Sequence, residues 1–239
     1  MTTLVKIAIA LTLSLLLSSC GLDFSNGEKG NGNLTSQNRI ITEGFTTVAA
    51  SEGLNVFVTQ ADDFKIKVEA DENIIDLIGT NIENDVLKIY AIKNIGNATK
   101  NIYVFLPKIM SLKSSSGAKL KAESTILTKK LKLETSSGAV LSAKIFTENI
   151  DVAASSGANI KLIGTTKNMN IEASSGAYIN ASDLKSERSN AQASSGANIK
   201  LNVSETLKAD ANSAGNISYS GKAKISTKKS VSGSVTYNN

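Results

Sequence analysis

Ser115-Ser116-Gly117-Ala118 is the first of five copies of one tetrapeptide, and the spacing of these copies predicts the fold. The glycines of the five copies are 21, 19, 19 and 20 residues apart: Gly117, Gly138, Gly157, Gly176 and Gly196. A sixth copy at residues 212–216 has Ala214 in the glycine slot, 18 residues further on. A period near 20 residues is typical of a solenoid, in which each repeat forms one coil stacked on the next.

Apolar and polar residues alternate on both sides of each glycine. In the third copy the apolar positions are Ile150, Val152, Ala154, Ala158, Ile160 and Leu162. Period-two alternation predicts two short parallel strands per coil with apolar side chains inside, and a third, less regular side. The bend between the two strands favours glycine, because glycine readily adopts a positive φ. We expect the paired serines to hydrogen-bond to one another or to backbone groups at the bend.

Before the repeats, the chain has the pattern of ordinary β-strands. Ile66 and Val68 alternate with charged residues, residues 83–85 are typical of a hairpin turn, and residues 71–78 could form one helical turn. We predict one domain over residues 40–239, since all-β folds often reach this length undivided. It would consist of a less regular β portion, residues 40–107, and the regular coils, residues 108–239.

The N-terminus has the pattern of an exported lipoprotein. Lys6 precedes an apolar run that is too short to span a bilayer as a stable helix, and Leu17-Ser18-Ser19-Cys20 resembles the lipobox of bacterial lipoproteins. We predict a signal peptide over residues 1–19, lipidation of Cys20, and attachment to the cell envelope, in the outer membrane. The polar composition of residues 20–39 predicts a flexible tether.

Residues 45–235 resemble the bacterial head GIN domain family of auto-transporter adhesins. The resemblance rests on Phe45, on the Gly53-Leu54-Asn55-Val56 stretch, on residues 65–71 and 102–107, and on the Ser-Ser-Gly-Ala repeat. It implies a right-handed parallel β-helix on exported, often lipid-anchored proteins. It supplies no catalytic residue.

Composition excludes several kinds of chemistry. The chain has no histidine and one cysteine, which excludes Ser-His-Asp triads and removes the usual ligands of zinc, copper and haem. An all-oxygen calcium site at Asp62-Asp63 or Asp71-Glu72 is the remaining metal possibility, but such carboxylates are common in turns for structural reasons. A net charge of +5 spread along a repeat does not form a nucleic-acid footprint. We therefore expect no cofactor, no nucleic-acid partner and no enzymatic activity.

The outward positions of the coils hold the candidate binding residues. Two residues after the glycine slot lie Asn159, Asn198 and Asn216, and Tyr178 in the same row could stack on a sugar ring. The asparagines could equally stabilise the stack. We expect a lipid-anchored adhesion module that contacts a glycan or a protein. The alternatives are a polysaccharide-active β-helix enzyme, which would need two suitably spaced carboxylates, and a structural component of the envelope.

Overall fold

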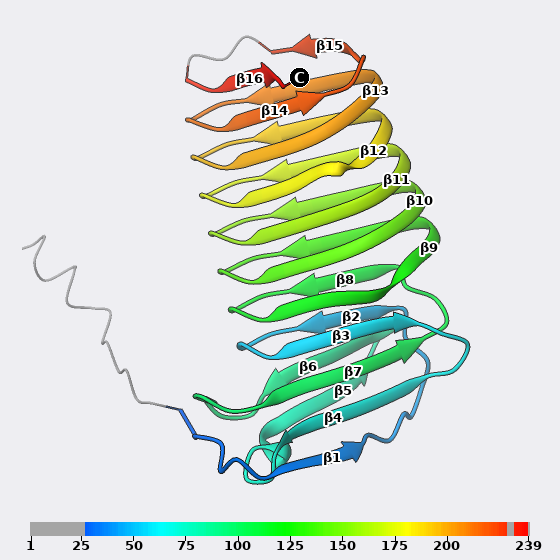
Figure 1. The fold of residues 1–239 in the computed structure, drawn as a ribbon, viewed down its shortest axis with the longest axis vertical. Helices are drawn as coiled ribbons and strands as arrows, with labels where there is room; N and C mark the ends of the chain where they lie inside the picture. Colours follow the sequence, from blue (N-terminus) through cyan, green and yellow to red (C-terminus); the bar gives the residue numbers. More distant parts are fainter. Residues whose placement is uncertain (1–26, 229–231, 239) are drawn as a thin grey trace, which may run out of the picture.

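The computed structural model describes residues 27–228 and 232–238 and has one tall stack of strands (Figure 1). The predicted signal peptide, residues 1–19, and Cys20 lie outside the described residues. The strands form one sheet that winds into a β-solenoid, as predicted. A single core of inward side chains runs along it from Phe45 to Ile217.

Five long strands form the regular coils. They are β9 (Lys119–Thr135), β10 (Val140–Ala154), β11 (Asn159–Ala173), β12 (Tyr178–Ala193) and β13 (Asn198–Ala211). Each pairs in parallel with its neighbours, so that like residues lie above like. Below, the part of a coil before the glycine is its first leg and the part after it the second leg. Each long strand therefore joins the second leg of one coil to the first leg of the next, and it bends at a second corner while its hydrogen bonds to the neighbouring coils continue.

The Ser-Ser-Gly-Ala copies form the corner between the first and second legs. In the third copy Ser156 has φ 52° and Gly157 has φ 71°, and the N–H of Ala158 donates to the carbonyl of Ser155 at 3.1 Å. Two positive φ values across this hydrogen bond define a type I′ turn. Glycine thus accounts for only one of the two left-handed positions, because the second serine occupies the other. In the sixth copy Ala214 takes the glycine slot with φ 61°.

Differences in coil length are absorbed beyond the corner, on the second leg. Lys121 and Thr125 of β9 pair with Ser142 and Lys144 of β10, so β9 holds two extra residues at this point. One extra residue of β12 is absorbed opposite Lys161 and Ile163 of β11. Bulges of this kind keep the corners in register although the repeat length varies.

The N-terminal half contributes two more coils, whose order in space differs from their order in sequence. Its strands are β2 (Thr47–Ala50), β3 (Asn55–Gln60), β6 (Val86–Ala91), β7 (Lys100–Leu106) and β8 (Ser111–Ser114). β3 pairs in parallel with both β7 and β9, and β2 pairs with both β6 and β8. The coil of β2 and β3 therefore lies between the coil of β6 and β7 and the regular coils (Figure 1). Its corner, residues 51–54, repeats the geometry of the others, with positive φ at Glu52 and Gly53.

Antiparallel strands cap the N-terminal end. They are β1 (Leu34–Asn38), β4 (Lys65–Asp71) and β5 (Ile78–Glu83), with a 3₁₀ turn over Ile75–Leu77. β4 pairs with β7, and β5 forms with β6 the predicted hairpin through Asn84 and Asp85. At the other end β14 (Asn216–Ser220), β15 (Lys224–Thr227) and β16 (Ser234–Tyr237) complete the stack.

The tether predicted over residues 20–39 is wrong for its described part, residues 27–39. β1 pairs antiparallel with β4, and Arg39 donates to the carbonyls of Ile75 and Ile78 at 2.8 and 3.1 Å. All five side chains of β1 are exposed, because it is an edge strand held by backbone hydrogen bonds. A strand without a buried face has no apolar alternation, which explains why its polar composition resembles a linker.

Candidate functional site

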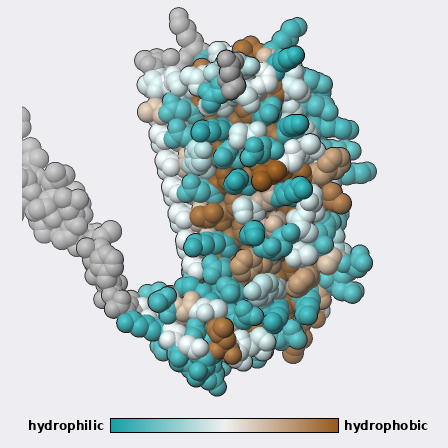
Figure 2. All heavy atoms as spheres, viewed as in Figure 1, coloured by the Kyte–Doolittle hydropathy of each residue, from teal (hydrophilic) through white to brown (hydrophobic). Residues whose placement is uncertain are grey.

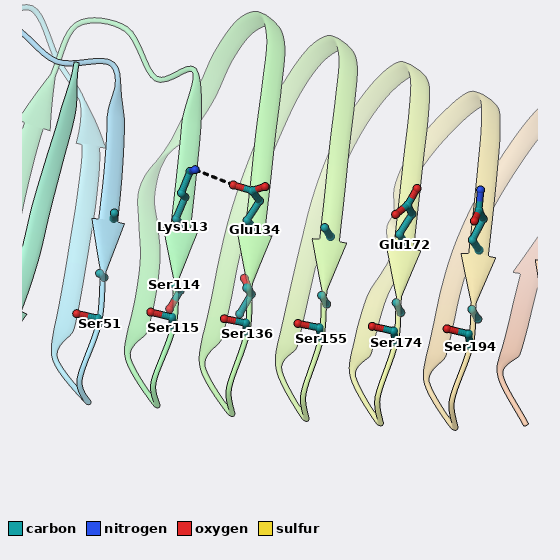
Figure 3. A pocket seen from close by; sticks show the side chains of 18 of the residues that line it. Ser51, Lys113, Ser114, Ser115, Glu134, Ser136, Ser155, Glu172, Ser174 and Ser194 are labelled. Atoms are coloured by element: carbon teal, nitrogen blue, oxygen red, sulfur yellow. Dashed lines mark ion pairs between the residues drawn. The ribbon is translucent and has the colours of Figure 1, made fainter. Parts of the chain in front are cut away.

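A groove of about 860 Å³ runs along the first legs of the coils, beside the type I′ corners. Its most regular feature is a row of hydroxyl groups two residues before each glycine slot, all pointing the same way (Figure 3). We call this the serine row: Ser51, Ser115, Ser136, Ser155, Ser174 and Ser194. Successive members are one coil apart, which is about 4.8 Å in a parallel sheet.

The hydroxyls of the serine row are largely unused by the protein. Ser51 Oγ makes a long contact with the carbonyl of Ile89, at 3.4 Å. Within residues 27–228 and 232–238 the other five hydroxyls have no hydrogen-bond partner in the chain. The expectation that the first serine of each pair supports the bend through its side chain is therefore wrong: at this position only the backbone carbonyl takes part in the turn, as for Ser155.

Longer side chains form the wall of the groove. Lys113, Glu134, Glu172 and Gln192 project two residues before the serine row, and Ala153 interrupts this wall between the two glutamates. Lys113 and Lys132 both bind the Glu134 carboxylate, at 2.9 and 2.7 Å. The hydrogen bond from Lys132, together with that from Lys113, holds the pKa of Glu134 below its usual range. Glu134 is thus an ionised carboxylate, not a proton donor near neutral pH.

An aromatic ring closes the N-terminal end of the groove. Tyr90 of β6 lies beside Ser51 and is half-buried. Its ring lies against Gly79 of β5, where a Cβ atom would come within 2.5 Å of the ring carbon Cζ. Because Gly79 has no side chain, the Tyr90 ring can pack directly against the backbone of β5. At the other end of the groove Asn212 replaces serine.

The residues predicted as a binding surface lie on the other side of the corner, on the second legs. The row runs through Asn159, Tyr178, Asn198 and Asn216 in register, as predicted. Asn159 and Asn198 donate to the carbonyls of Gly157 and Gly196, at 3.3 and 3.2 Å, and Asn216 donates to Asn198 Oδ1 at 3.3 Å. We call these three the asparagine row. Asn159 and Asn198 thus bond within their own corners, whereas the bond from Asn216 to Asn198 joins neighbouring coils.

Tyr178 is the aromatic member of this row within the described coils. The Lys200 ammonium lies 6.0 Å from the centre of its ring, at the outer limit of a cation–π contact. Figure 2 shows the side of the solenoid over β3 and β7, where hydrophilic side chains predominate and hydrophobic ones lie between them. No hollow among those described brings Tyr178 together with the asparagines.

A second hollow lies near the second corner. It has a volume of about 660 Å³ and contains Leu127 and Phe146, which are paired across β9 and β10. Their side chains are 59% and 64% exposed. These two residues form the apolar patch, which Lys129, Glu148 and Lys167 surround.

Among the candidate calcium ligands, Asp71 has a structural role. Asp71 is buried and accepts the N–H groups of Gly32 and Thr99, at 2.7 and 2.6 Å. It therefore holds the segment before β1 against the loop before β7. Over residues 27–228 and 232–238 no group of three or more acidic side chains is placed to hold a metal ion.

Comparison with known proteins identifies the family. Residues 44–223 match the family described as "putative auto-transporter adhesin, head GIN domain". The chain belongs to this family. The search of curated proteins found no match to this head GIN protein.

Solved structures share the fold of this head GIN protein. A "putative adhesin" from Bacteroides fragilis superposes with a TM-score of 0.80 at 19% identity, over 88% of this chain and 99% of its own. A second "putative adhesin", from Parabacteroides merdae, superposes with a TM-score of 0.75 at 18% identity, over 89% of this chain and 99% of its own. A "putative lipid binding protein" from Parabacteroides distasonis gives 0.70 at 18% identity, over the same shares. At these identities the likeness shows the β-solenoid alone.

The groove of the head GIN protein was not predicted from the sequence. The sequence pattern favours a role for these serines in the bend, because serines often bind nearby backbone groups. One signal could have found it: the serine lies on the outward parity of its leg, as Glu134 and Glu172 do, and therefore faces solvent.

Over residues 27–228 and 232–238 no helix is long and apolar enough to cross a membrane.

Proposed function

We propose that this head GIN protein is a lipid-anchored binding module of the bacterial cell envelope, without catalytic activity, that presents its solenoid to a glycan or a protein. The observation that carries the proposal is the groove over the first legs, where five serine hydroxyls on successive coils have no hydrogen-bond partner in the part of the chain that the structure describes. A surface of this kind suits an extended partner, because the same contact can be repeated at every coil. The family description as an adhesin supports the same role.

Attachment to the membrane would depend on Cys20, the only cysteine in the chain. Two or more acyl chains give stable anchoring, whereas one alone is marginal. We expect Cys20→Ala to move the protein from the membrane fraction to the soluble fraction. A variant that stays membrane-bound would contradict the lipobox. Protease accessibility on intact cells then tests which side of the outer membrane the solenoid faces.

The binding surface can be located with three matched variants. Ser155→Tyr fills the groove, Asn159→Tyr adds the same side chain on the opposite side of the same corner, and Phe146→Ser removes the aromatic member of the apolar patch. The coils already accept tyrosine at the position of Asn159, since Tyr178 occupies it in the next coil. Envelope fractions and host glycans are the test ligands. We expect Ser155→Tyr alone to abolish binding, and failure of the unmodified protein to bind any of them would overturn the proposal.

A polysaccharide-cleaving enzyme is the second candidate. Glu134 and Glu172 line the same groove two coils apart, which is about 9.5 Å at the usual strand spacing. Inverting glycosidases place their two carboxyl groups at roughly 6.5–9.5 Å, but they need one carboxyl with a raised pKa, and that of Glu134 is lowered. Release of reducing ends from polysaccharides, with and without calcium, tests this candidate. Release that is lost in Glu172→Gln would establish it over our preferred function.

A further inference from the structure

The spacing of the serine row indicates the kind of ligand that fits the groove. Each hydroxyl can both donate and accept a hydrogen bond, and it recurs once per coil in the same orientation (Figure 3). The repeat of about 4.8 Å exceeds the rise per residue of an extended peptide, about 3.3 Å, and falls short of two residues. It is comparable to the length of one sugar unit in an extended glycan. A glycan lying along the solenoid axis would therefore meet a hydroxyl at each unit.

A peptide lacks a mode of binding in this groove. Peptides that add to a sheet need a free strand edge. Here the groove crosses the strands, and their backbone groups are already paired from coil to coil: the N–H of Ser136 donates to Ser114, and that of Ser155 to Thr135. Between the wall and the serine row, the groove is lined by residues such as Ala154 and Ala173, whose side chains are buried in the core, so it offers no pockets for peptide side chains.

The charges of the groove point to a neutral ligand. Two lysines and two glutamates line it. Lys88 is paired with Glu83, and Lys113 with Glu134. An anionic polymer would need a continuous basic track, which this balance does not provide.

Tyr90 supplies a stacking surface at the N-terminal end of the groove. Its ring lies against Gly79, and the residue is partly exposed beside Ser51. Aromatic rings whose apolar face remains accessible are suited to the flat faces of sugars.

From these observations we infer that the groove binds a neutral, extended polysaccharide along the solenoid axis, with one end of the chain stacked on Tyr90. The inference rests on the proposed function and specifies its ligand. The serine row supplies hydrogen bonds to successive sugar units, and the gap at Ala153 leaves room above the middle of the groove.

The test measures binding of defined hexasaccharides by calorimetry. Cellohexaose, laminarihexaose, maltohexaose and chitohexaose are the neutral probes, and heparin and polygalacturonate are the anionic ones. We expect saturable binding of at least one neutral probe and none of the anionic ones. Ser155→Tyr is expected to weaken it at least roughly tenfold and Tyr90→Ala roughly tenfold, while Asn159→Tyr stays within about twofold.

A spectroscopic readout keeps the inference testable if Tyr90→Ala is unstable. The chain has no tryptophan, so Tyr90→Trp introduces a single reporter that preserves the stacking surface. We expect the bound hexasaccharide to shift its emission, with the same concentration dependence as in calorimetry. A saturating saccharide that leaves this emission unchanged would overturn the placement of the ligand on Tyr90.

The two proposals fail in different ways. If no neutral hexasaccharide binds but envelope or host proteins do, the glycan inference is wrong and the binding module remains. Preference for heparin or polygalacturonate likewise contradicts only the inference. Binding that Ser155→Tyr leaves intact contradicts the inference and also the location of the binding surface in the groove. Loss of both glycan and protein binding would overturn both.

Discussion

The serine row and the asparagine row flank the same corner at Gly157 and at Gly196, two residues before and two residues after the glycine. Both recur along the regular coils and both are polar. Yet the side-chain amides of Asn159 and Asn198 donate to corner carbonyls. The hydroxyls of Ser155 and Ser194, in contrast, have no hydrogen-bond partner within the described chain. Repetition of a polar residue therefore does not by itself separate a structural role from a binding role. What separates them is whether the protein already uses the hydrogen-bonding capacity of the side chain.

The largest effect is expected from breaking the corner that both rows share. Gly157→Val places a β-branched residue at φ 71°, a conformation that costs L-residues about 2 kcal/mol. We expect a loss of about this size in the free energy of unfolding, measured by urea denaturation. Ser156→Gly is the control, since φ is already positive there, and it should change stability by less than about 1 kcal/mol. An unchanged Gly157→Val protein would mean that the corner does not require glycine.

A smaller effect is expected from the asparagine row. Asn198→Ala removes the hydrogen bonds to the carbonyl of Gly196 and from Asn216, and should cost about 1 kcal/mol. Saccharide affinity should stay unchanged, because these amides lie outside the groove. Ser194 is the counterpart of Asn198 before the same glycine. If Asn198→Ala and Ser194→Ala lower the free energy of unfolding equally, the distinction between the rows is wrong.

Glu134 in the groove wall should make the free energy of unfolding depend on pH. Because the pKa of Glu134 is lowered in the folded protein, its stabilisation is present above the unfolded carboxyl pKa and is lost as pH falls through the folded value. The carboxylate is one-third exposed, so we expect less than about 1 kcal/mol. The stability difference between the unmodified protein and Glu134→Gln should shrink from about pH 5 to pH 3. A difference that is constant over this range would show that the two lysines do not stabilise the folded state through this carboxylate.

The smallest effect on stability is expected from the serine row itself. Ser194→Ala deletes a hydroxyl without a partner in the described chain and should change the free energy of unfolding by less than about 0.5 kcal/mol. Replacing Ser136, Ser155 and Ser174 together by alanine should leave the thermal midpoint nearly unchanged but weaken saccharide binding. A marked loss of stability would assign this row to the scaffold after all.

The regular coils could be predicted from the sequence because two signals coincide there. The glycine spacing gives the coil, and the alternation around residues such as Ile160 and Ile179 gives the buried face; both are buried as expected. The corner at residues 51–54 has no signal in the repeat pattern because Glu52 and Leu54 replace the second serine and the alanine, so that only Ser51 and Gly53 remain of the motif. The turn geometry persists because it depends on positive φ at two positions, not on the tetrapeptide.

The arrangement of the N-terminal half could not be predicted. Alternation in β3 shows which side chains are buried, such as Val56 and Val58, but it does not show which strands lie beside it. The edge strand β1 gave no signal because both of its faces are exposed. The groove was missed for another reason: whether the hydroxyl of Ser155 is bonded depends on the positions of neighbouring coils, which the sequence pattern does not give.

The interleaved position of β2 and β3 affects how the protein is made. During synthesis β3 leaves the ribosome before either of its neighbours, β7 and β9, so it has no completed strand on which to form. Such pairing over long sequence separations is slow compared with the formation of local contacts. The coil of β2 and β3 must wait for both partners, and the stack then extends from it in two directions, towards the cap and towards the regular coils. A nascent chain that stalls after residue 64 would therefore present this coil with both of its edges unpaired.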